Sequence, residues 1–145
     1  MDATFMARTQ TNITDLLSEL KLKYPEFVFK KGAKFSFRPP RTIMVGPLGE
    51  PGAELLLLHE IGHAICKHRN FTTDIQRLKM EREAWEKARE LAIKYEVEFD
   101  DELAEEELDS YREWLDHKSR CPKCGLARYQ ARDGHYHCPR CENFA

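Results

Sequence analysis

The chemistry in this sequence begins with the segment His59-Glu60-Ile61-Gly62-His63. In an α-helix, side chains four positions apart lie about 40° apart around the axis and one turn apart along it, so both imidazoles can bind one ion. Zinc held in this way lowers the pKa of a coordinated water to about 7, and a neighbouring carboxylate can accept its proton. The pattern therefore predicts His59 and His63 as metal ligands and Glu60 as the general base of a hydrolytic centre.

The residues around this motif are apolar, with Leu55 to Leu58 before it and Ala64 and Ile65 after it. Burying histidine and glutamate side chains without partners would be strongly unfavourable, which favours a bound metal. Histidines that are merely hydrogen-bonded within an ordinary core helix are the alternative. Gly62 costs a helix interior about 1 kcal/mol relative to alanine, so it indicates that another element approaches the motif closely.

A catalytic zinc needs a third protein ligand and an open position for water. The longer motif with a third histidine is excluded, because Cys66 and Arg69 occupy its glycine and histidine positions. In a helix predicted over residues 73–95, the apolar periodicity places Glu81 in the buried face and Glu83 toward solvent. A buried carboxylate requires a compensating cation, so we predict Glu81 as the third ligand. An ion pair of Glu81 with arginine or lysine, or ligation by Glu83 instead, are the alternatives.

Four of the five cysteines form two Cys-Pro-x-Cys turns near the end of the chain, made by Cys121, Cys124, Cys138 and Cys141. Two such turns aim four thiolates at one tetrahedral ion, which predicts a structural zinc site in a ribbon with a hairpin through Tyr129 and Tyr136. Zinc would supply most of the stability of so short a segment. A redox role is the less favoured alternative, because no βαβ pattern surrounds either pair. Since four thiolates complete the site, we expect His135 and His137 to be surface residues.

The ribbon is basic, whereas the segment before it is acidic. Residues 81–116 contain fifteen Asp or Glu against five Lys or Arg, and residues 118–145 contain six Lys or Arg against two acids. The basic side chains of the ribbon include Arg120, Lys123, Arg128, Arg132 and Arg140. Basic residues near tyrosines that can stack on bases make nucleic acid a candidate partner, and a protein partner is the equal alternative.

Several elements must position these groups. Apolar spacing predicts a first helix over residues 14–24, with Asn12 or Thr14 as its cap, and alternating apolar residues predict two or three short strands over residues 27–45. A proline- and glycine-containing loop then leads into the motif helix, which begins near Ala53, and helices follow over residues 73–95 and 101–115. We expect an α+β fold in which a small antiparallel sheet packs on the motif helix and on the glutamate-bearing helix. The predicted domains are residues 1–116 and a zinc ribbon over residues 117–145.

The HEIGH motif, followed about twenty residues later by Glu81-x-x-Ala84 on a second helix, resembles the glutamate-type zincins (gluzincins). The string EREAW is most similar to the minimal zinc metallopeptidases of the ImmA/IrrE type, and the resemblance covers roughly residues 13–95. It implies a compact peptidase domain with zinc on His59, His63 and Glu81 and with Glu60 as general base. The chain departs from the family at Trp85, where many relatives carry Asn or Asp. A hydrogen bond to a zinc-bound histidine must therefore come from elsewhere or be absent.

We therefore expect a zinc-dependent endopeptidase that acts on an intracellular protein and holds one catalytic and one structural zinc. An edge strand near residues 42–45 could pair with an extended substrate, and Tyr95, Tyr111 or His68 could stabilise the oxyanion. One alternative is a nucleic-acid-associated ribbon protein, including a SprT-like DNA-linked peptidase, although that family uses a histidine as third ligand. Another is a pseudo-peptidase that keeps zinc for structure.

The longest unbroken apolar run, Leu55 to Leu58, is far too short to cross a bilayer, so we expect no membrane partner. The N-terminal stretch contains Arg8 but no apolar segment typical of a secretory signal. Cysteine spacing that suits metal rather than disulfides agrees with a cytoplasmic location. The fifth cysteine, Cys66, is expected to be a small buried residue.

Overall fold

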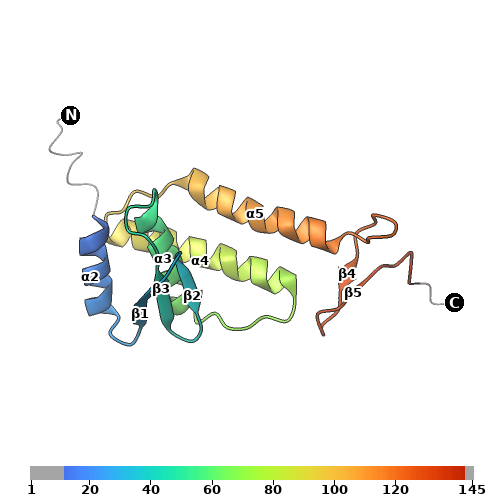
Figure 1. Ribbon diagram of the computed structural model, residues 1–145, viewed down its shortest axis with the longest axis horizontal. Helices are drawn as coiled ribbons and strands as arrows, with labels where there is room; N and C mark the ends of the chain where they lie inside the picture. Colours follow the sequence, from blue (N-terminus) through green and yellow to red (C-terminus); the bar gives the residue numbers. More distant parts are fainter. Residues whose placement is uncertain (1–11, 143–145) are drawn as a thin grey trace.

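The structure is a computed structural model, and the residues that it describes are 12–142. Its elements are α2 (Ile13–Lys23), β1 (Val28–Lys31), β2 (Ser36–Arg38), β3 (Thr42–Val45), α3 (Ala53–Ile65), α4 (Asp74–Lys94), α5 (Asp101–Ser119), β4 (Tyr129–Gln130) and β5 (Tyr136–His137) (Figure 1). The α+β class is confirmed, and Asn12 caps α2 by accepting hydrogen bonds from the backbone of Thr14 and Asp15. Helix α5 continues past the predicted end at Leu115. The expectation about the N-terminal stretch around Arg8 lies outside the described residues.

The three-stranded sheet has the order β1-β3-β2 and is mixed. Strand β2 pairs antiparallel with β3, but β1 pairs parallel with β3, so the prediction of an antiparallel sheet is wrong for β1. The reason is that the chain after β1 crosses to the far side of β3 instead of turning back beside β1. Strand β3 is therefore central, and the prediction of an edge strand at residues 42–45 is wrong as well. The edges of this sheet are β1 and β2.

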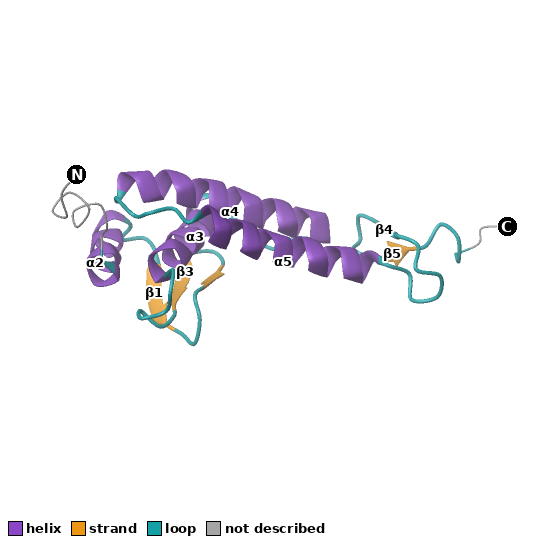
Figure 2. Cartoon of the chain, turned by 90° about the horizontal axis from the view of Figure 1, so that it is seen from above, coloured by secondary structure: helices purple, strands orange, loops and turns teal. Residues whose placement is uncertain are grey.

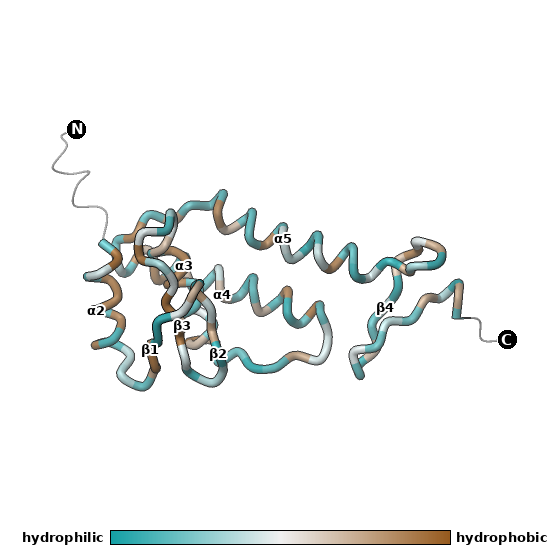
Figure 3. The backbone as a smooth tube through the Cα atoms, in the orientation of Figure 1, coloured by the Kyte–Doolittle hydropathy of each residue, from teal (hydrophilic) through white to brown (hydrophobic). Residues whose placement is uncertain are grey.

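The hydrophobic core lies where α2, the sheet, α3 and α4 meet. Its fully buried large side chains are Leu16, Leu20, Ile43, Leu57, Leu58 and Ile61. Figure 3 shows hydrophobic residues concentrated in α2 and α3, whereas α5 is mostly hydrophilic. Helix α3 is buried along nearly its whole length, which places the polar groups of its HEIGH segment inside the protein.

Helices α3 and α4 approach each other closely at Gly62. A Cβ atom added at Gly62 would lie 2.6 Å from the backbone oxygen of Ala84, a distance shorter than van der Waals contact allows. The prediction of a close approach at Gly62 is confirmed, and Ala84 provides the small surface that the approach needs. This contact sets the spacing between the helix that carries the histidines and the helix that carries Glu81.

Replacing Gly62 with alanine should therefore push the two helices apart and destabilise the protein by about 1 to 3 kcal/mol, which is the usual cost of overpacking a core. Urea unfolding followed by circular dichroism would measure the change. Gly49→Ala is the matched control, because a Cβ atom there meets nothing within 4 Å. Equal stability of the two variants would contradict the close approach.

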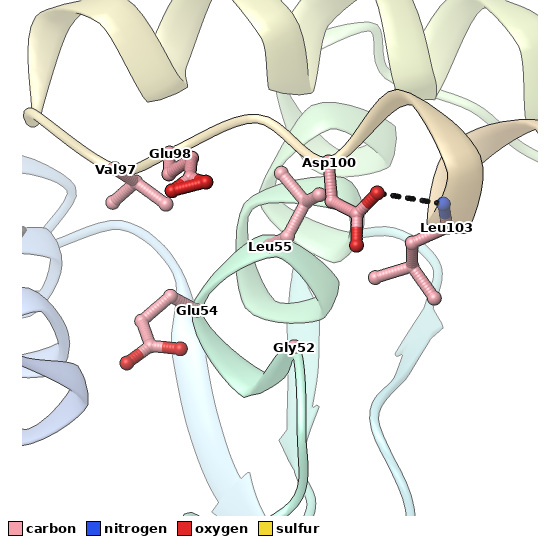
Figure 4. A pocket seen from close by; sticks show the side chains of 7 residues that line it. All are labelled: Gly52, Glu54, Leu55, Val97, Glu98, Asp100 and Leu103. Carbon is pink, nitrogen blue, oxygen red and sulfur yellow. Dashed lines mark hydrogen bonds between the residues drawn. The ribbon is translucent and has the colours of Figure 1, made fainter.

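Helix α5 runs alongside α4 and leads to the ribbon at the end of the molecule opposite α2 (Figures 1 and 2). None of the helices among residues 12–142 combines the length and apolar character that a membrane-crossing segment needs. A small cavity of about 120 Å³ lies where the start of α3 meets the start of α5, and Asp100 caps α5 beside it by accepting a hydrogen bond from Leu103 (Figure 4). None of the predicted site residues lines this cavity.

Candidate metal centres

Helices α3 and α4 bring His59, His63 and Glu81 together. The two oxygens of the Glu81 carboxylate lie 3.0 Å from His59 Nε2 and 3.1 Å from His63 Nε2, respectively. Glu81 is only 9% exposed, as its place in the apolar face of α4 predicted. Burial alone would raise the pKa of Glu81, but hydrogen bonds with the two imidazoles outweigh it and lower the pKa to about 2. The centre therefore contains an ionised carboxylate between two imidazoles.

Glu60 lies beside this group on α3 and is buried. One carboxylate oxygen of Glu60 and one nitrogen each of His59 and His63 all lie within 4.8 Å of one another, a grouping that could bind a metal ion. Burial, and after it the charges of Glu81 and Glu107, raise the pKa of Glu60 to about 8. Both carboxylates are therefore close to the imidazoles, Glu81 by direct contact with each ring and Glu60 as a member of the group within 4.8 Å.

A chain of hydrogen bonds leads away from His63 on its other side. His63 Nδ1 lies 2.8 Å from His68 Nδ1, and His68 Nε2 lies 3.0 Å from a carboxylate oxygen of Glu83. Glu83 is thus partly buried against His68 rather than directed wholly to solvent. His68 follows the end of α3, where Lys67 adopts φ 58° and the chain turns back so that the His68 N–H donates to the His63 carbonyl.

These hydrogen bonds hold the rings of His63 and His68 in place, and which nitrogen donates in each contact depends on the tautomer of the histidine. On the other side of the His63 ring, Nε2 lies 3.1 Å from an oxygen of Glu81. A cation fits between Glu81 and the two imidazoles, because ligand atoms about 2.0 to 2.1 Å from zinc lie roughly 3.3 Å apart around a tetrahedral ion.

The other histidine of the motif, His59, differs from His63 in the surroundings of its Nδ1 atom. His59 Nδ1 is buried and has no hydrogen-bond partner among the described residues, and the ring of Trp85 stacks on the His59 ring with centroids 4.2 Å apart. Trp85, at the position where many of the peptidases that this motif resembles carry Asn or Asp, therefore contacts His59 by stacking. His63 has His68 as a hydrogen-bond partner.

Replacing His68 with alanine should weaken zinc binding at this centre about 10- to 100-fold, because His63 loses the hydrogen-bond partner that orients its ring. Glu83→Gln keeps an acceptor oxygen for His68 and should cost less. Competition with a chromophoric chelator would measure the affinities, with the exposed Glu86→Gln on the same helix as control. Unchanged zinc affinity in the His68 variant would show that the hydrogen bond between His68 and His63 does not orient His63.

The centre opens into a cavity of about 500 Å³ between the sheet, the three helices α3, α4 and α5 and the loop that joins α3 to α4. Strand β2 contributes Ser36 and Phe37 to its wall, and α5 contributes Tyr111. Burial raises the pKa of Tyr111, and the nearby charge of Glu81 adds to this effect. Among the three candidates for stabilising an oxyanion, Tyr111 and His68 line the cavity and Tyr95 does not.

The four cysteines of the ribbon converge as predicted. Their sulfur atoms all lie within 4.8 Å of one another, and the pairs Cys121–Cys141 and Cys124–Cys138 are 3.8 and 3.7 Å apart. These separations are too long for disulfides and match the roughly 3.8 Å expected between thiolates about 2.3 Å from one tetrahedral zinc. This group could bind a metal ion. The hairpin predicted through Tyr129 and Tyr136 is present as β4 and β5.

The ribbon is docked on the N-terminus of α4 through Asp74. The buried Asp74 carboxylate accepts hydrogen bonds from the Tyr136 hydroxyl at 2.7 Å and from the Lys118 ammonium at 2.9 Å. The Asp74 N–H donates to the side chain of Gln130 at 2.6 Å. The Tyr136 hydroxyl is therefore engaged by Asp74, and stacking of the Tyr136 ring on a base stays a prediction.

Two of the predicted basic residues also serve the ribbon itself. Arg128 donates to the backbone oxygens of Lys118 and Ser119, and Arg120 pairs with Asp116. The remaining predicted basic side chains, Lys123, Arg132 and Arg140, are exposed. Binding of nucleic acid by the ribbon stays a prediction, and these three exposed residues are the ones that remain to carry it.

The other residues singled out lie apart from both centres. His137 pairs with Glu142 at 2.7 Å, and His135 is exposed, so neither joins the cysteine group. Cys66 is partly buried at the end of α3, and burial raises the pKa of its thiol. No family model, curated protein or solved structure matches this chain.

Proposed function

We propose that this protein is a zinc-dependent endopeptidase, with zinc on His59, His63 and Glu81 and a second, structural zinc on the four cysteines. The observation that carries the proposal is a single carboxylate of α4 in contact with both imidazoles of the HEIGH motif beside a cavity of about 500 Å³. Two imidazole nitrogens and one carboxylate, with an open side toward the cavity, are the ligand set of known hydrolytic zinc centres.

Zinc bound there would supply a Lewis acid for a water molecule and for the substrate carbonyl. Glu60 would act as general base, because it lies beside the proposed ligands and the charge of a bound zinc would lower the pKa that burial raises. It would take a proton from the attacking water and pass it to the leaving amine. Tyr111 would donate its hydroxyl to the developing oxyanion, since His68 is held by His63 and Glu83.

A peptide substrate is supported by the strand beside the cavity. Within residues 12–142, strand β2 pairs only with β3, and its residues Ser36 and Phe37 line the cavity wall. The free backbone edge of β2 could pair with an extended peptide and hold it across the centre by main-chain hydrogen bonds. The proposed partner strand for the substrate is therefore β2, and not the strand at residues 42–45 that was expected from the sequence.

The experiment that tests the proposal is hydrolysis of degenerate, internally quenched fluorescent peptides by the full chain. Protein reconstituted with zinc should cleave members of the pool, a chelator should stop the reaction, and added zinc should restore it. Zinc-loaded protein that cleaves no member of the pool would instead favour the pseudo-peptidase alternative.

A further inference from the structure

Arg77 lies one helical turn before Glu81 on α4, and both residues line the cavity. The guanidinium carbon of Arg77 lies 4.9 Å from the ring centroid of Trp114 and 5.0 Å from that of Tyr111, both on α5. It lies 5.6 Å from the ring of Phe71, in the loop before α4. Three aromatic rings from two elements therefore hold this cation beside the metal centre.

The acidic residues nearest to Arg77 along α4 are already engaged. Asp74 accepts hydrogen bonds from Tyr136 and Lys118, and Glu81 contacts the two histidines. Among residues 12–142, Arg77 takes part in no ion pair with a carboxylate, whereas Arg89, Arg112 and Arg120 each do. Arg77 thus lines the substrate cavity as a guanidinium whose carboxylate partner is not provided by the described part of the chain.

The surroundings of Arg77 suit a side chain or chain end that combines a carboxylate with apolar groups. Phe71 and Trp114 are 41% and 37% exposed, which is high for large hydrophobic side chains. They can cover the aliphatic part of a ligand while the planar guanidinium donates to both carboxylate oxygens. Stacked rings do not remove these N–H donors, because a carboxylate binds in the plane of the guanidinium.

We propose that Arg77 is a carboxylate-binding subsite of the cleft, so that the preferred peptides carry a carboxylate close to the bond that is cut. This inference rests on the proposed peptidase function. One helical turn is about 5.4 Å and an extended peptide rises about 3.3 Å per residue, so the carboxylate belongs within about two residues of the scissile bond. It can come from an Asp or Glu side chain or from the C-terminus of the peptide.

The test compares three kinds of degenerate hexapeptide, each labelled with a fluorophore that has no carboxylate and each without Asp or Glu at the degenerate positions. The first kind has Glu at a central position and a C-terminal amide. The second kind has Gln at that position and a C-terminal amide. The third kind has Gln at that position and a free C-terminal carboxylate. Binding to zinc-loaded Glu60→Gln protein is measured by fluorescence polarisation, so the readout does not depend on turnover. We expect about a tenfold preference for one carboxylate-bearing kind over the neutral kind, and the kind preferred identifies the source.

Arg77→Gln should remove this preference. Arg69→Gln should keep it, because Arg69 lines the same cavity and loses the same charge but contacts none of the three rings. A purely structural role of Arg77 would lower thermal stability without changing the ratio between peptides. Equal affinity for all three kinds, or a preference that survives in Arg77→Gln, would overturn the subsite.

Cleavage by the wild-type protein separates this inference from the proposed function. Hydrolysis of all three kinds at equal kcat/KM would leave the peptidase standing and remove the subsite. A carboxylate preference in binding that depends on Arg77, without cleavage of any peptide, would keep the subsite and remove the peptidase.

Discussion

Replacing Glu60 with glutamine should lower peptide hydrolysis by about 10²- to 10⁴-fold, which is the usual contribution of a general base. The zinc content should stay unchanged, because the proposed ligands are His59, His63 and Glu81. Glutamine has nearly the shape of glutamate but cannot accept the proton of the attacking water. Initial rates on the fluorescent peptide pool and elemental analysis of the same samples would measure both quantities.

The matched control is Glu54→Gln, which makes the same change at the start of α3, outside the cavity that contains the centre. It should hydrolyse the pool at the wild-type rate. Hydrolysis that persists in Glu60→Gln with zinc bound would remove Glu60 from the mechanism. Loss of zinc from Glu60→Gln would instead identify Glu60 as a zinc ligand. Its carboxylate is close enough to His59 and His63 for that role, because the three ligand atoms lie within 4.8 Å of one another.

The second large effect is expected in the ribbon. Replacing Cys138 with serine should unfold it, because zinc binding supplies about 10 to 16 kcal/mol to structural sites of this kind and two-residue strands bury little surface by themselves. Loss of the hairpin also removes Tyr136 and Gln130 from Asp74. Hydrogen exchange should therefore accelerate in β4 and β5 and at the first turn of α4.

Cys66→Ser is the control for the ribbon, since it removes a thiol outside the group of four. It should leave exchange in the ribbon unchanged. Slow exchange in β4 and β5 of the Cys138→Ser protein would mean that packing on α4, and not a metal, stabilises the hairpin.

Local patterns were sufficient to predict the parts of both centres that depend on one element. Helical spacing predicted that His59 and His63 share a face, and the apolar periodicity of α4 predicted the burial of Glu81. Gly62 predicted the close contact that positions one helix against the other. The two cysteine turns predicted a group of four thiols, because the short spacing within each turn sets the relative position of its two cysteines.

Features that depend on contacts between distant elements could not be read in the same way. Alternation of apolar residues indicates which face of a strand is buried but not which strand is its neighbour, so the parallel pairing of β1 and the central place of β3 were missed. His68 follows a left-handed turn at Lys67, where no periodicity places a side chain. The ring contacts of Arg77 and the hydrogen bond of Tyr136 arise because α5 and the ribbon pack on α4, which no local signal in the sequence indicates.

Zinc stoichiometry, by elemental analysis of the purified wild-type chain, Glu81→Gln and Cys121→Ser, tests the proposal of two zinc centres. We expect two zincs per wild-type chain, loss or weakening of one in Glu81→Gln, and loss of the other in Cys121→Ser. One zinc in the wild-type chain that is lost only in Cys121→Ser would contradict it, because the pair of histidines and Glu81 would then form a hydrogen-bonded core group and not a metal centre.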